Sequence, residues 1–183
     1  MKKVYLMGDS IRLIGYGLKV PQMLENEFEV SQPEENCRWS SSLFRIAFDK
    51  GELLDTMDII HFNSGEWDVS DILGDGPFTG PDEYVKTMKR LGKFLLTKAD
   101  TVIFATTTPV LEGHIHNDNE TIRKYNELIV PEYEKMGIII NDLYSVVDSD
   151  REKYVRSDDR IHLTEEGIDV CAKQVCEVLR KYK

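Results

Sequence analysis

One serine near the amino end and one aspartate–histidine pair near the carboxyl end are the residues of this sequence best suited to chemistry. Ser10 closes a Gly-Asp-Ser turn after the apolar run at residues 3–7, and Asp159 stands three positions before His162. A serine hydroxyl becomes a good nucleophile when an imidazole takes its proton and a carboxylate fixes the imidazole tautomer. Separately, the first motif is an ordinary turn and the second an ordinary helix entry or surface ion pair. Together they predict attack on an acyl group.

The elements that must bring these residues together follow from the apolar pattern. Strands are predicted at residues 3–7, 28–31, 57–62, 101–108 and 137–142, and helices at 18–28, 40–50, 81–99, 120–137 and 163–183. Thr164 is expected to cap the last helix. Apolar strands that alternate with helices predict an α/β fold, a flavodoxin-like three-layer α/β/α sandwich with a five-stranded parallel sheet, in one domain over residues 1–183.

The carboxyl ends of the strands are where such folds place their sites. Ser10, the segment 63–68, the loop 106–119 and the segment after the fifth strand all follow strand ends. We therefore expect them to share one edge of the sheet.

Composition excludes some classes of partner. The 183 residues carry a formal net charge of -10, from 33 acidic and 23 basic residues, which argues against binding to nucleic acid or to an anionic membrane surface. No apolar run approaches the length of a membrane span or a signal peptide, so a cytoplasmic location is expected, with a mature secreted form as the alternative. Three cysteines without metal-site or disulfide spacing are expected to be reduced: Cys37, Cys171 and Cys176.

Over essentially its whole length the chain resembles the GDSL, or SGNH, hydrolase family. The matching features are Gly8-Asp9-Ser10 after the first strand and residues 159–163, Asp-Arg-Ile-His-Leu, before the last helix. The resemblance implies a serine esterase fold with Ser10 as the nucleophile. It further implies that His162 is the general base and then the general acid, and that Asp159 orients it.

The third block of the family departs from the usual pattern. The family has Gly-x-Asn-Asp after the third strand, and its Asn donates a hydrogen bond to the oxyanion. Here residues 65–68 read Gly-Glu-Trp-Asp, so Trp67 stands where the family has Asn. Asn63 is the alternative oxyanion donor, or else a turn amide with a structural role. This arrangement is similar to the Asn-x-Gly-x-Trp stretches of polysaccharide O-acetyl esterases and transferases.

The second block of the family supplies a backbone N–H from a glycine after the second strand. Residues 36–40 read Asn-Cys-Arg-Trp-Ser and contain no glycine. The N–H of Arg38 or of a neighbour is the expected replacement, and the N–H of Ser10 completes the predicted oxyanion hole.

Three further residues are candidates for binding the substrate: Asp9, Trp39 and Trp67. The two tryptophans follow strand ends and could form a platform for a sugar ring, with packing in the core as the alternative. No cofactor is implied, and no metal site is predicted, because His114 and His116 lack an evident third ligand. His61, inside a strand, is expected to be an interior histidine.

The sequence thus predicts a serine esterase that removes an acyl group, acetyl by preference, from a small polar or carbohydrate substrate. A lipase, a thioesterase or an acyl transferase would use the same three residues. A catalytically weak SGNH-like domain that binds a glycan or a protein is the alternative from another class, and the missing glycine and the Trp67 substitution favour it.

Overall fold

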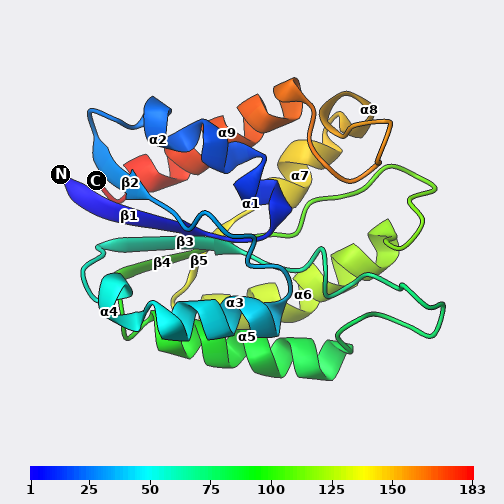
Figure 1. The fold of residues 1–183 in the computed structure, drawn as a ribbon, viewed down its shortest axis with the longest axis horizontal. Coiled ribbons are helices and arrows are strands. Elements are labelled where there is room, and N and C mark those ends of the chain that lie inside the picture. The colour runs from blue at the N-terminus through cyan, green and yellow to red at the C-terminus, as the bar shows by residue number, and fades with distance from the viewer.

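A five-stranded parallel sheet forms the middle layer of the structure, a computed structural model that describes residues 1–183 (Figure 1). The strands are β1 (Lys2–Met7), β2 (Phe28–Ser31), β3 (Ile59–Asn63), β4 (Thr101–Ala105) and β5 (Ile139–Asn141). They lie in the order β2-β1-β3-β4-β5, and every neighbouring pair is parallel. The predicted α/β sandwich is confirmed, and its order is that of flavodoxin-like folds.

Helices cover both faces of this sheet, as Figure 1 shows. One layer contains α1 (Ser10–Leu13), η1 (Tyr16–Leu18), α2 (Val20–Met23), α7 (Leu143–Asp148), α8 (Arg151–Tyr154) and α9 (Glu165–Arg180). The other contains α3 (Ser40–Asp49), α4 (Gly51–Leu54), α5 (Pro81–Leu95) and α6 (Asn119–Lys135). No helix is both long and apolar enough to cross a membrane.

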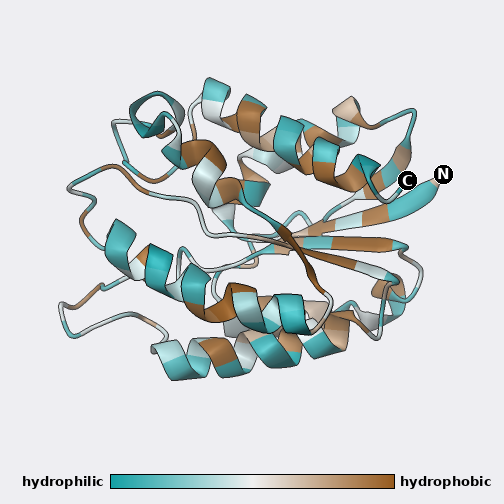
Figure 2. Ribbon diagram, turned by 180° about the vertical axis from the view of Figure 1, so that it is seen from behind, coloured by the Kyte–Doolittle hydropathy of each residue, from teal (hydrophilic) through white to brown (hydrophobic).

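Side chains that alternate along the strands build a separate core under each layer. Val4 and Leu6 of β1 pack in the cluster that includes α9, whereas Tyr5 and Met7 pack in the cluster that includes α5 and α6. Figure 2 shows the matching pattern, in which hydrophobic and hydrophilic residues alternate along the helices. Because the inner strands β1, β3 and β4 are mostly buried on both faces, they read as nearly continuous apolar runs.

Most element boundaries agree with the predictions, and the differences have local causes. Thr164 caps α9 by accepting the N–H of Gly167 at 3.1 Å, as predicted. The expected helix at 18–28 is instead two short pieces, η1 and α2. The fourth strand ends at Ala105 and not at residue 108, because Thr107 leaves the ladder and donates its N–H to the Asn126 side chain. Helices of four to six residues, such as α1 and α7, are too short to show a helical period.

Candidate active site

The turn after β1 holds Ser10 at the first position of α1. Asp9 caps this helix, because its Oδ1 accepts the N–H of Ile11 at 2.9 Å. Glycine is required at position 8, where a Cβ would lie 1.9 Å from Oδ1 of Asn63. Ser10 itself is partly exposed. The Gly-Asp-Ser sequence is therefore a tight strand-to-helix turn that presents the serine at the edge of the sheet.

Arg12 fastens this turn to the segment after β2. Its guanidinium is fully buried and forms no ion pair with a carboxylate. It donates instead to the main-chain oxygens of Pro33 at 2.8 Å, Glu35 at 2.7 Å and Gly8 at 3.2 Å. The N–H of Cys37 also donates to Gly8 O, at 3.0 Å. Two strand ends are thereby joined beside Ser10.

Asn63, the last residue of β3, lies behind the same turn. Its Nδ2 donates to Asp9 Oδ1 at 2.7 Å, and its Oδ1 accepts the hydroxyl of Tyr16 at 2.8 Å. Asn63 is 4% exposed and Asp9 is fully buried. Burial raises the pKa of the Asp9 carboxyl, and the hydrogen bonds from Asn63 and Ile11 oppose that effect. The Asn63 amide thus supports the turn that carries Ser10, and one of its two N–H groups has no partner in the protein.

Asp159 and His162 contact one another in the segment that precedes α9. Asp159 Oδ2 lies 3.0 Å from His162 Nδ1, and Asp159 Oδ1 accepts the N–H groups of His162 at 3.0 Å and Ile161 at 3.1 Å. Partial burial acts to raise the pKa of Asp159, but these hydrogen bonds outweigh it and hold the pKa below its usual value. The carboxylate can therefore accept the Nδ1–H of the imidazole and leave Nε2 as the basic atom.

One pocket of about 260 Å³ joins the two motifs. Its lining residues are Ser10, Glu66, Trp67, Ser70, Ile72, His114, His116, Asn117, Ile161 and His162. The pocket lies at the carboxyl edge of the sheet, as predicted. No hydrogen bond connects Ser10 to His162 in this structure, and such contacts commonly tighten only when substrate binds.

Glu66 is a pocket residue that sequence reasoning did not select. It is 3% exposed, and it accepts hydrogen bonds from the Thr108 hydroxyl at 3.0 Å and from Asn117 Nδ2 at 3.1 Å. Burial, reinforced by the nearby Asp9 carboxylate, raises the pKa of Glu66 to about 8. The only signal in the sequence was its place directly after the third strand, between Gly65 and Trp67.

Glu66→Gln is expected to flatten the pH dependence of stability above pH 4.5. The folded carboxyl has a pKa of about 8 against 4.5 for an ordinary Glu, so between these values the folded state binds more protons. The stability that this group contributes is therefore complete below pH 4.5 and lost as the pH rises through 8, by at most about 1.4 kcal/mol per pH unit.

Urea unfolding between pH 6.5 and 8.5 measures this effect. The wild type should lose stability over that range, and the variant should lose clearly less. Glu177→Gln on α9 is the matched control, because Glu177 is exposed. Parallel pH profiles for the wild type and Glu66→Gln would contradict the prediction.

The structure distributes the other predicted site residues unevenly around the pocket. Trp67 lines it and is 40% exposed. Trp39 does not line it, and packs edge-on against Phe78 with ring centroids 5.5 Å apart. Asp9 is buried under the turn, where it caps α1 and does not reach the pocket. Trp67 is thus the only one of the three substrate-binding candidates that lines the pocket with Ser10.

The segment 36–40 holds Arg38 away from the pocket. Arg38 is exposed, has a φ of 56°, and donates its N–H to Asn36 Oδ1 at 2.8 Å. The Arg38 N–H, the predicted oxyanion donor of this segment, is therefore already occupied. Ser40, two residues further on, donates its N–H and hydroxyl to Asp68 at 2.9 and 2.6 Å, so the segment is fastened to the region after β3.

The three remaining histidines take part in hydrogen bonds within the protein. His114 Nδ1 accepts the N–H groups of His116 at 3.3 Å and Asn117 at 2.9 Å, and His116 Nδ1 lies 3.2 Å from Asp71 O. His61 is fully buried, and its Nε2 lies 3.1 Å from Nδ2 of Asn141. Burial lowers the pKa of His61 to about 3, so this interior histidine is neutral. No group of three or more potential metal ligands occurs.

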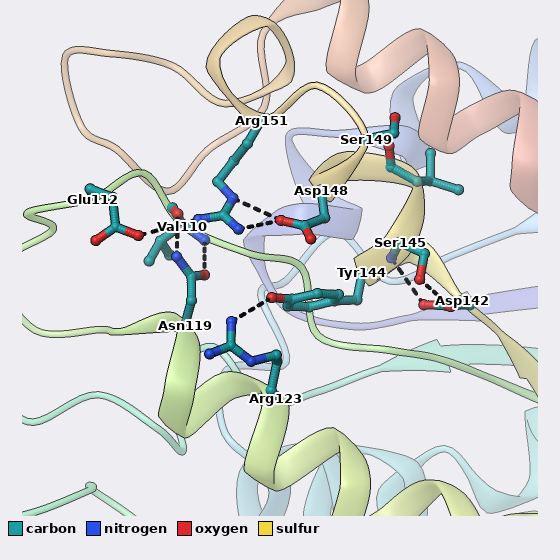
Figure 3. Close-up of polar contacts among 11 residues, drawn as sticks. Val110, Glu112, Asn119, Arg123, Asp142, Tyr144, Ser145, Asp148, Ser149 and Arg151 are labelled. Carbon is teal, nitrogen blue, oxygen red and sulfur yellow. Dashed lines mark hydrogen bonds and ion pairs between the residues drawn. The ribbon is translucent and has the colours of Figure 1, made fainter.

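Polar contacts fasten the loop after β4 to neighbouring segments, as Figure 3 shows. The Asn119 side chain accepts the N–H of Val110 at 3.0 Å and donates to the Val110 main-chain oxygen at 2.9 Å. The Arg151 guanidinium donates to the Glu112 carboxylate at 3.4 Å. Leu111 N–H donates to Arg160 O at 2.9 Å, which joins this loop to the segment that carries Asp159 and His162.

A second cleft of about 330 Å³ lies between α6 and the start of α7 and includes Arg123 and Tyr144. Arg123 donates to the Tyr144 hydroxyl at 3.3 Å, while Asp142 caps α7 through Ser145. Figure 3 shows these contacts. The cleft contains neither Ser10 nor His162, so it is separate from the candidate active site.

Comparisons with known proteins agree with this geometry. No protein-family profile matches the chain. It is 23% identical over 159 residues to GDSL esterase/lipase At2g38180 of Arabidopsis thaliana, and the aligned region covers 79% of this chain and 51% of that relative. It is 25% identical over 138 residues to GDSL esterase/lipase WDL1 of Oryza sativa subsp. japonica, and the aligned region covers 67% of this chain and 53% of that relative. The chain therefore spans about half the length of the curated relatives it matches.

Solved structures match the fold over nearly the whole chain. The acetyl xylan esterase AlAXEase superposes with a TM-score of 0.81 at 18% identity, covering 97% of this chain and 99% of that one. The lipase/acylhydrolase from Enterococcus faecalis superposes with a TM-score of 0.83 at 15% identity. The match covers 100% of this chain and 97% of that one.

The sheet order, the serine turn after β1 and the Asp–His pair before α9 define a three-layer α/β/α fold of the SGNH hydrolase class. The resemblance to GDSL, or SGNH, hydrolases seen in the sequence is confirmed: two curated GDSL esterase/lipases are similar to the chain, and solved esterase and acylhydrolase structures share its fold.

Proposed function

We propose that this protein is a serine esterase that uses Ser10, His162 and Asp159 as a catalytic triad. The observation that carries the proposal is the single pocket lined by Ser10 and His162, in which His162 is already bonded to Asp159 at 3.0 Å. A binding domain would have no need to keep these three groups together. The named relatives and neighbours, which are esterases and lipases, support the same activity.

In the proposed reaction, Ser10 Oγ attacks the ester carbonyl while His162 Nε2 takes its proton. The Nδ1–H donates to Asp159, whose negative charge stabilises the imidazolium that forms. His162 then protonates the leaving alcohol, and the ester carbon stays bonded to Ser10 as an acyl-enzyme. Water, activated by the same imidazole, releases the acid and restores the serine.

The proposed oxyanion hole combines the N–H of Ser10 with the free N–H of Asn63 Nδ2. Asn63 is held from both ends, by Asp9 at 2.7 Å and by Tyr16 at 2.8 Å. A donor that is fixed before the reaction stabilises the developing charge without reorganising. A loop amide next to Arg38 is the proposed third donor, since the Arg38 N–H is occupied by Asn36.

The proposed substrate is an acetyl or other short acyl ester of a small polar alcohol or a carbohydrate. A pocket of about 260 Å³ suits a small acyl group better than a long chain. Trp67, 40% exposed on its wall, offers a flat apolar surface of the kind on which sugar rings pack. The similarity to acetylxylan esterases supports the same choice.

Structures of the Geobacillus stearothermophilus acetylxylan esterase give further support. They include catalytic mutants in which a Ser, an Asp or a His is replaced by Ala. The Asp and His of that enzyme are three positions apart, as Asp159 and His162 are here. We propose the same roles for the corresponding residues of this chain.

Labelling with a fluorophosphonate tests the proposal directly. The probe should phosphonylate one serine of the wild type, and mass spectrometry should place the adduct on the peptide that contains Ser10. An unlabelled Ser10 in a folded protein that binds oligosaccharides would support the alternative of a non-catalytic binding domain.

Asn63→Ala is expected to lower kcat for p-nitrophenyl acetate by roughly 10²-fold with little change in KM, because an oxyanion donor acts mainly on the transition state. The matched variant is Trp67→Phe, which keeps an aromatic ring on the pocket wall and removes the indole N–H. It should lower kcat much less. If Trp67 is the true donor, Trp67→Phe should instead lower kcat strongly and Asn63→Ala only slightly. Small and equal losses of kcat in both variants would mean that backbone amides alone form the oxyanion hole.

A further inference from the structure

Glu66 is the only acidic residue that lines the pocket, and the proposed triad does not use it. It lines the same pocket as Ser10 and His162, while the contact to the histidine is made by Asp159. Its side chain comes from the turn after β3, and the residue is 3% exposed. A carboxyl group buried this deeply has a large desolvation cost unless its environment compensates for it.

The protein around Glu66 compensates only in part. No Lys or Arg pairs with it; its two side-chain partners are the Thr108 hydroxyl at 3.0 Å and Asn117 Nδ2 at 3.1 Å. Both groups act as donors to the carboxyl oxygens. The Oδ1 of Asn117 is buried and has no hydrogen-bond partner. This part of the pocket therefore has capacity to hydrogen-bond a group that the protein itself does not supply.

A purely structural role for the carboxyl is the simpler explanation to weigh. Glu66 could serve only to fasten the loop after β4 to the end of β3. However, the main-chain oxygen of Glu66 already accepts Asn117 Nδ2 at 2.9 Å, and this contact makes the same connection without the side chain. A buried carboxyl at this position is better explained by a ligand.

We propose that Glu66 binds a hydroxyl group of the alcohol part of the substrate, adjacent to the ester that Ser10 attacks; the inference rests on the proposed esterase function. A hydroxyl both donates and accepts, so it can bond a carboxyl group that burial keeps protonated at neutral pH. Trp67, the next residue, lines the same pocket and would contact the apolar face of the ring that carries the hydroxyl. The substrates are therefore esters of vicinal diols, such as partly acetylated sugars.

Two esters that differ by one hydroxyl test this inference: trans-2-hydroxycyclohexyl acetate and cyclohexyl acetate. The wild type should prefer the hydroxylated ester by about tenfold or more in kcat/KM, because a site built to bond a hydroxyl discriminates against its absence. Glu66→Leu should abolish the preference. Glu66→Gln, which still donates and accepts, should keep most of it. Glu112→Leu is the control, because Glu112 is exposed and outside the pocket, and it should keep the wild-type ratio.

Circular dichroism shows whether each variant is folded, and Glu66→Met replaces the leucine variant if the latter is not. A wild type without preference overturns the inference. So does an equal loss of both activities in folded Glu66→Leu, which is the result that a structural role predicts. If Ser10 is labelled by the fluorophosphonate and only the preference is missing, this inference alone fails. If neither ester is cleaved and Ser10 is unlabelled, the proposed esterase function fails first.

Discussion

Ser10→Ala is expected to lower kcat for p-nitrophenyl acetate by roughly 10⁴- to 10⁶-fold while the protein stays folded. Loss of the nucleophile removes the covalent route completely, and what remains is the weak catalysis that binding and oxyanion donors provide. Folding should be preserved because the cap of α1 comes from Asp9 and the anchor of the turn from Arg12, and neither contact uses the Ser10 hydroxyl.

Ser70→Ala is the matched control, since Ser70 is the other serine that lines the pocket. It should retain activity within a few-fold of the wild type. Steady-state kinetics with thermal unfolding of each variant makes the comparison. Wild-type turnover in Ser10→Ala, or loss of activity in Ser70→Ala alone, would contradict the assignment of the nucleophile.

Asp159→Asn is expected to lower kcat by roughly 10³- to 10⁴-fold. An amide at this position can present its N–H groups to His162 Nδ1, which stabilises the tautomer with the proton on Nε2 and removes the base that faces the serine. The replacement also removes the charge that stabilises the imidazolium. The Asp159 bonds to the main-chain N–H groups of Ile161 and His162 can be kept by the Asn oxygen, so the turn should survive.

The neighbouring Asp158→Asn is the control for this second prediction. Asp158 pairs with Arg156 on the surface and does not contact His162. Its replacement should leave kcat within about threefold of the wild type. Fluorophosphonate labelling of Ser10 should slow in Asp159→Asn in parallel with kcat. Equal activities for the two variants would show that His162 acts without Asp159.

Features that depend on neighbours along the chain were accessible from the sequence. The sheet, the turn at Ser10 and the cap at Thr164 each follow from residue types within a few positions of one another. The Asp159–His162 contact spans three positions and forms within one turn. Once the strands were recognised as parallel, the shared edge followed as well, because parallel strands end on the same side.

The finer parts of the site depend on contacts between segments far apart in the chain. The Glu66 carboxyl accepts a hydrogen bond from Asn117, 51 residues away, and burial together with the Asp9 carboxylate raises its pKa. Asn63 supports the turn that carries Ser10 through its contact with Asp9, 54 residues away.

The sequence by itself thus determined the fold, the edge that carries the site and the residues of the candidate triad. Only the tertiary structure decided which tryptophan reaches the pocket, which amide is already occupied and which buried carboxyl lines the pocket. The physical reason is that burial and hydrogen-bond saturation are properties of a packed environment. Residues 38 and 67 can be recognised as polar or aromatic from their types, but whether an N–H is free or a ring is exposed depends on which distant segments pack around it.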